Sequence, residues 1–232
     1  MTNDHVSTIE TPQIILTTVG VSLLRVCSAL PDAERPVSRE AMTEVLQNTS
    51  TVAPSAPMQR TLEELARYLS LHPELLLRSA EFDTLALFRR RMVSTNDPRQ
   101  WYLPRVRYAF IGSDTYVGHW MLARFRDFFG SHHPNVPIGP DILVRGLQVR
   151  SATGLDTALR EMQFVLDRAT RPYPHYQVLL CISGGYKFIS GWMQSYAVQR
   201  GFAAIYTYED SNELIMAQPQ IPGDFPPRLL FI

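Results

Sequence analysis

Short apolar runs rich in β-branched residues alternate with longer amphipathic runs along most of the chain, and this alternation constrains the fold more than any other feature. Because a strand–helix–strand order makes successive strands parallel, the pattern predicts an α/β, Rossmann-like fold, which is a mainly parallel sheet flanked by helices. Strands are expected at residues 13–19, 106–111, 142–149, 176–183, 202–208 and 213–216. Helices are expected at residues 22–30, 117–129, 155–166 and 187–200.

A helical insertion is expected after the first strand–helix unit, at about residues 31–104. The chain is long enough for one domain with a substantial apolar core. We therefore predict a polar N-terminal tail at residues 1–12 and a single domain at residues 13–232 that contains the insertion.

Within the insertion, Ser38 is predicted to be the N-cap of a helix, and Thr61 is predicted to begin another one. Residues 48–57 are rich in Ser, Thr and Pro, which is typical of an exposed loop. Residues 75–87 are apolar and helix-prone, and Arg89-Arg90-Arg91 follows them. We interpret this triplet as a solvated helix face, with a ligand-facing role as the alternative.

The charge balance limits the class of ligand. Lys and Arg together number 22, as do Asp and Glu, so the formal net charge is zero. A protein that coats long nucleic acids normally carries a basic excess, so we expect no long nucleic acid as a partner. A small anionic ligand at one local site stays compatible with this balance. The sequence contains a single lysine, Lys187.

Neither a membrane nor a metal is predicted as a partner. No apolar run approaches the roughly 20 residues that span a bilayer, and the N-terminus lacks the features of a signal peptide. We therefore expect a cytoplasmic protein. Cys27 and Cys181 lie in apolar surroundings and are predicted to be buried, reduced thiols. Because the sequence has no CxxC or Cys/His zinc pattern, no metal and no cofactor is expected.

The candidate site consists of three polar segments that follow predicted strands. In an open α/β sheet, ligands bind beyond the carboxyl ends of the strands, and helix N-termini there favour anions. Lys187 would add a cation in the first turn of its helix, although chance would also explain one remaining lysine. The candidate residues are Gly20, Val21, Ser22, Ser113, Asp114, Thr115, Ser183, Gly184, Gly185, Tyr186 and Lys187.

Several standard motifs are absent. The chain has neither a GxGxxG nor a GxxxxGK[ST] sequence, which disfavours a standard dinucleotide fold or a P-loop. A GxSxG nucleophile elbow is also missing, so Ser22 is a poor candidate for a hydrolase nucleophile. Asp114 is open to two interpretations, as an acid/base group or as an Asx-type cap of the following helix.

Four segments, taken in order, resemble the CRISPR-associated Rossmann-fold (CARF) proteins, which sense cyclic oligoadenylates in type III CRISPR systems. They are Thr17-Thr-Val-Gly-Val-Ser-Leu-Leu24, Phe110-Ile-Gly-Ser-Asp-Thr115, Gly146-Leu-Gln-Val149 and Cys181-Ile-Ser-Gly-Gly-Tyr-Lys187. The resemblance extends over nearly the whole chain. The chain departs from the family pattern where Val21 replaces a Thr, Cys181 an Asn and Ser183 a Thr, so side-chain contacts to a ligand are expected to differ.

The resemblance implies a homodimer that holds a ring of AMP units on its two-fold axis. Because little sequence follows the last predicted strand, the chain resembles a stand-alone CARF protein of the ring nuclease type. Such a protein cleaves cyclic oligoadenylate, here expected to be cyclic tetra-adenylate, by attack of a ribose 2′-hydroxyl without a metal, and so ends type III CRISPR signalling. In this interpretation Lys187 stabilises the phosphate charge and Ser22 orients the 2′-hydroxyl or the phosphate.

Two alternatives stay open. The first is a non-catalytic CARF receptor that binds the ring and regulates a partner or a C-terminal effector. The second is an unrelated nucleotide-binding α/β enzyme.

Overall fold

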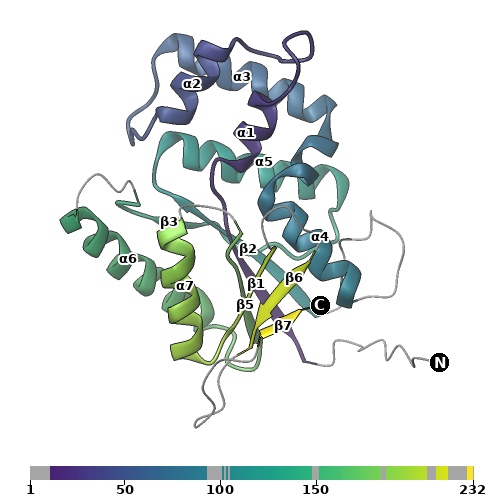
Figure 1. Ribbon diagram of the computed structural model, residues 1–232, viewed down its shortest axis with the longest axis vertical. Coiled ribbons are helices and arrows are strands. Elements are labelled where there is room, and N and C mark those ends of the chain that lie inside the picture. Colours follow the sequence, from purple (N-terminus) through teal and green to yellow (C-terminus); the bar gives the residue numbers. More distant parts are fainter. Residues whose placement is uncertain are drawn as a thin grey trace.

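The computed structural model describes residues 11–92, 101, 103, 105–147, 152–183, 187–207, 213–218 and 229–231. Within these residues the chain forms one seven-stranded sheet with the order β3-β2-β1-β4-β5-β6-β7 (Figure 1). The first five strands in this order are parallel, whereas β6 pairs antiparallel with β5, and β7 pairs antiparallel with β6. The predicted Rossmann-like fold is therefore confirmed. The strands are β1 Gln13–Thr18, β2 Val106–Ser113, β3 Ile142–Val144, β4 Gln177–Cys181, β5 Ala203–Thr207, β6 Leu214–Ala217 and β7 Leu229–Phe231.

Helices cover both faces of the sheet, because successive apolar side chains of β1 point to opposite faces. Ile15 packs with the helical insertion and α5, whereas Ile14 and Leu16 pack with α6 and α7 on the other face. Both sets are almost fully buried, and every residue of β1 is buried, as in parallel strands that are covered on both sides. The helices outside the insertion are α1 Ser22–Ser28, α5 Tyr116–His132, α6 Ala152–Thr170 and α7 Lys187–Arg200.

The strand order creates a switch point between β1 and β4. The chain builds the sheet outward from β1 through β2 to β3, and then crosses to the other side of β1 to form β4. The connections leaving β1 and β4 therefore diverge, and a crevice opens above the carboxyl ends of these two strands. This is the usual ligand position in an open α/β sheet.

The insertion consists of α2 Arg39–Gln47, α3 Ala56–Leu71, the 3-10 helix η1 Pro73–Arg78 and α4 Ala80–Met92. Ser38 is the N-cap of α2, as predicted, and its hydroxyl accepts the Ala41 N–H at 3.2 Å. The predicted start of the next helix at Thr61 is wrong, because α3 begins at Ala56 with Ser55 as N-cap and a proline in its first turn.

One further prediction in the insertion needs correction. The Arg triplet is not a uniformly solvated face, because Arg89 is buried and its guanidinium lies 5.3 Å from the centre of the Trp101 ring. Arg90 and Arg91 are exposed, as predicted. The predicted loop at residues 48–57 is mostly exposed, as predicted, although its last two residues belong to α3, and the Ser50 carbonyl accepts the Tyr116 N–H at 2.9 Å, which ties this loop to the start of α5.

Three other boundaries differ from the sequence pattern. Helix α5 continues through Gly130 to His132, because Gly130 keeps a helical conformation there. Strand β3 ends at Val144, and Gly146 has a φ of +72°, which a glycine adopts at little cost. The predicted helix-prone run at residues 75–87 divides at Ser79 into η1 and α4. The thiols of Cys27 and Cys181 are free and buried, as predicted, and burial raises their pKa to about 11 and about 12.

Candidate functional site

A cavity of about 300 Å³ lies at the switch point of the sheet. The segments that follow β1, β2 and β4 all contribute to its walls, so the structure brings together three segments that are far apart in the sequence. Of the predicted site residues, those that line this cavity are Gly20, Val21, Ser22, Ser113, Thr115 and Ser183.

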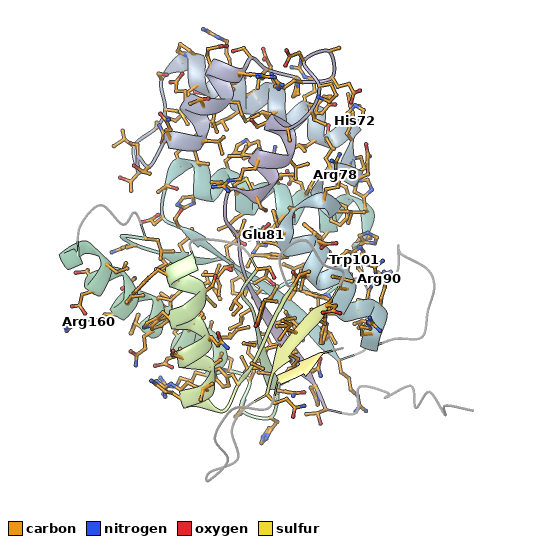
Figure 2. The ribbon with its side chains drawn as sticks, in the orientation of Figure 1. His72, Arg78, Glu81, Arg90, Trp101 and Arg160 are labelled. Carbon is orange, nitrogen blue, oxygen red and sulfur yellow. The ribbon has the colours of Figure 1, made fainter. Side chains whose placement is uncertain are left out.

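The first segment is held by a carboxylate that the sequence analysis did not select. Glu81 of α4 is fully buried, and its Oε1 accepts the Gly20 N–H at 2.8 Å. Its Oε2 accepts the hydroxyl of Ser22. Burial raises the pKa of Glu81, while its hydrogen bonds to Ser22 and Gly20 oppose that shift. Figure 2 shows Glu81 near the centre of the molecule, where the insertion meets the ends of the strands.

The two donors bound by Glu81 change the expected role of the first segment. The Gly20 N–H and the Ser22 hydroxyl were predicted to face the ligand, and here both donate to a carboxylate. Val21, at the N-cap position of α1, makes no side-chain capping bond, which agrees with the loss of a hydroxyl at that position. Arg25 of α1 is exposed and lines the cavity, so it is a cation that the sequence analysis missed.

The second segment forms a tight turn into α5. Thr115 is the N-cap, and its Oγ1 accepts the Gly118 N–H at 2.9 Å. The hydroxyls of Ser113 and Thr115 also lie within 2.9 Å of each other. This turn needs a glycine at position 118, because a Cβ there would lie 2.2 Å from the Ser113 carbonyl oxygen.

We expect Gly118→Ala to lower the free energy of unfolding by about 1–3 kcal/mol, because the added methyl group overpacks the turn beneath the cavity. Gly130→Ala is the matched control in the same helix, since a Cβ at Gly130 meets no atom within 4 Å. That variant should gain about 0.5–1 kcal/mol from the higher helix propensity of alanine. Urea unfolding of both variants checks this, and equal stabilities would contradict it.

Asp114 lies apart from the other described candidate residues. It is absent from the wall of the switch-point cavity and lines a second one, of about 450 Å³, beside β3 and α6. Its carboxylate lies 2.8 Å from His119 Nε2 and 3.8 Å from Arg145 Nε. The Asx-cap interpretation is wrong, because the capping side chain belongs to Thr115. Asp114 thus makes a surface charge pair next to the turn.

The third segment follows β4. The Ser183 hydroxyl lies 2.5 Å from Thr84 Oγ1 of α4, and it accepts the Thr207 N–H at 3.2 Å. Lys187 is the first residue of α7, as predicted, but its side chain lies outside the described part of the chain. The predicted ligand contacts Gly184, Gly185 and Tyr186 also lie outside the described residues.

The helical insertion contributes to the site from two directions. Helix α4 supplies Glu81 beneath the first segment and Thr84 beside the third. The α2–α3 region closes another side of the cavity with Leu46, Asn48 and Thr49. Among the described residues there is no cluster of three or more His, Cys, Asp or Glu side chains suited to a metal ion. In the same part of the chain, no helix is both long and apolar enough to cross a membrane.

A protein-family model described as CRISPR-associated protein (Cas_APE2256) matches residues 77–220, which is more than half of the chain. The matched region begins just before α4 and contains the second and third segments of the cavity. It therefore includes Glu81, Ser183 and Lys187, whereas the first segment precedes it. No curated protein matches the chain.

Proposed function

Because the chain belongs to the family of CRISPR-associated proteins described as Cas_APE2256, we propose that it binds a cyclic oligoadenylate and cleaves it to linear products. One observation carries this proposal: three polar strand-end segments, including the turns that resemble those of CARF proteins, line one cavity at the switch point of the sheet. We place this activity in the cytoplasm, where it ends type III CRISPR signalling.

The size of the cavity supports a ligand shared between two chains. At about 300 Å³ it lies at the lower end of the range for small-molecule sites, about 300–1,000 Å³. One chain therefore offers room for a part of a nucleotide ring. A two-fold dimer presents two identical cavities, and a ring of four AMP units has a matching two-fold symmetry.

The proposed reaction needs alignment more than acid–base chemistry. The ribose 2′-oxygen forms a bond to the adjacent phosphorus, and the bond from phosphorus to the 5′-oxygen breaks. The proton of the 2′-hydroxyl ends on the released 5′-oxygen, so the products are a 2′,3′-cyclic phosphate and a 5′-hydroxyl. Holding the three reacting atoms in line accounts for much of the rate.

We assign the phosphate contacts to Lys187 and to the backbone at Gly184 and Gly185, with Arg25 as a further cation. Lys187, at the start of α7, stabilises the charge that grows on the phosphate oxygens. Ser22 orients the 2′-hydroxyl. The Gly20 N–H is less suited to a phosphate, because it already donates to Glu81.

A receptor without catalytic activity is the second candidate. The contact between Ser22 and Glu81 favours it, because a hydroxyl that donates to a carboxylate is not available to donate to a phosphate. Such a protein would bind the ring and leave it intact after long incubation.

We expect calorimetric titration with cyclic tetra-adenylate to give one ring bound per two chains, because each chain supplies half of the site. Linear tetra-adenylate is the control and should bind more weakly, since it is not preorganised as a ring. Binding of AMP at one molecule per chain, with no binding of the ring, would contradict the proposal and indicate an unrelated nucleotide-binding enzyme.

A further inference from the structure

Two polar side chains of helix α4 bind residues that line the cavity. Glu81 and Thr84 are three residues apart, so they lie on the same side of the helix, and both are fully buried. Glu81 binds the segment after β1, and Thr84 binds Ser183 after β4 and also lies 2.6 Å from Thr207 Oγ1. One helix thus connects the two segments that flank the switch point.

Burying a glutamate with only these partners lowers the stability of the fold, so such a residue is expected where it has a function. Moving a carboxyl group out of water disfavours its charged form, and burial is the largest cause of its raised pKa. Within the described residues, no ion pair compensates Glu81, and its hydrogen-bond partners are hydroxyl and backbone N–H groups. A leucine or glutamine would fill this place in a core at lower cost.

The hydrogen bond between Glu81 and Ser22 has a definite direction when the carboxylate is charged. An ionised carboxylate can only accept, so the Ser22 hydroxyl must donate its hydrogen to Oε2. The two lone pairs of Ser22 Oγ then stay available for a donor in the cavity. A ribose 2′-hydroxyl is a donor of this kind.

We propose that Glu81 is a positioning residue for ring cleavage, which acts through Ser22 by fixing its Oγ as the acceptor for the attacking 2′-hydroxyl. This inference rests on the proposed function and goes beyond it, because it gives the insertion a part in the reaction. The Gly20 N–H holds the other oxygen of the carboxylate and so fixes the plane of the group.

Glu81→Gln tests the inference with little change in shape. If the amide oxygen keeps the bond to the Gly20 N–H, its NH₂ group donates to Ser22 and reverses the direction of that hydrogen bond. We expect kcat to fall by about 10²-fold, since a misplaced reacting group can cost that much, while the affinity for cyclic tetra-adenylate changes less than about threefold. Glu74→Gln on the exposed part of η1 is the matched control and should keep wild-type kcat.

A double-mutant cycle separates positioning from a structural effect. If Glu81 acts through Ser22, the Ser22→Ala/Glu81→Gln variant should lose no more kcat than Ser22→Ala alone. Losses that multiply, or wild-type kcat in Glu81→Gln, would overturn the inference. Glu81→Asp withdraws the carboxylate by one methylene and should lower kcat by a similar factor. It replaces Glu81→Gln in the test if thermal unfolding shows that the Glu81→Gln protein is unfolded. A wild-type protein that leaves every ring intact would instead contradict the proposed function itself.

Discussion

Lys187→Ala should lower the rate of ring cleavage by about 10²–10³-fold, which is the cost of removing one group that stabilises developing charge in a transition state. Lys187 opens α7, where the helix dipole disfavours a cation by about 0.3–1 kcal/mol. A cation kept in this position is explained by an anionic partner. The affinity for the intact ring should fall less than the rate, because the backbone donors of the same loop are unchanged.

The measurement is single-turnover cleavage of cyclic tetra-adenylate, with binding followed in parallel. Arg160→Ala is the control for loss of a surface cation, since Arg160 lies on the exposed side of α6 (Figure 2) and pairs with Asp156 at 3.0 Å. It should cleave like the wild type. A wild-type cleavage rate in Lys187→Ala would show that Lys187 has no part in the reaction.

Phe82→Ala should cause the largest loss of stability, about 3–5 kcal/mol. Phe82 is fully buried next to Glu81, and its ring lies 4.7 Å from that of Phe125 and 5.4 Å from that of Trp101. These contacts join α4 to α5, so their loss leaves a cavity between the insertion and the sheet layer. Because α4 carries Glu81, turnover should also fall in the folded fraction.

Urea unfolding checks this prediction, with Phe164→Ala as the control. The Phe164 side chain is 61% exposed on α6, so its removal should change the free energy of unfolding by less than about 0.5 kcal/mol. A loss below about 1 kcal/mol in Phe82→Ala would contradict the view that this aromatic cluster anchors the insertion.

Strand β7 was not predicted, but strands β1 to β6 and their flanking helices were predictable because their signals are local. Each strand is a short run of apolar residues with turn residues after it, and α7 begins at Lys187 and ends before Gly201 as the sequence indicates. The meeting of the three polar segments was also predictable, since it follows from the parallel order of the strands.

Glu81 could not be assigned from its immediate neighbours, because its role depends on a tertiary contact with Gly20 and Ser22, about sixty residues earlier. A signal did exist in the sequence. Glu81 lies at helical spacing from Leu85 and Phe88, so an acidic residue occupies the apolar stripe of α4. The same stripe holds Arg89, which explains why this arginine is buried against Trp101.

Incubation of the protein with synthetic cyclic tri-, tetra- and hexa-adenylate, followed by chromatography of the products, tests the central claim most directly. EDTA in the reaction would exclude a contribution from contaminating metal ions. We predict that cyclic tetra-adenylate is converted to linear products that carry 2′,3′-cyclic phosphate ends. Recovery of all three rings intact from folded protein after long incubation would contradict the proposed cleavage and favour a receptor.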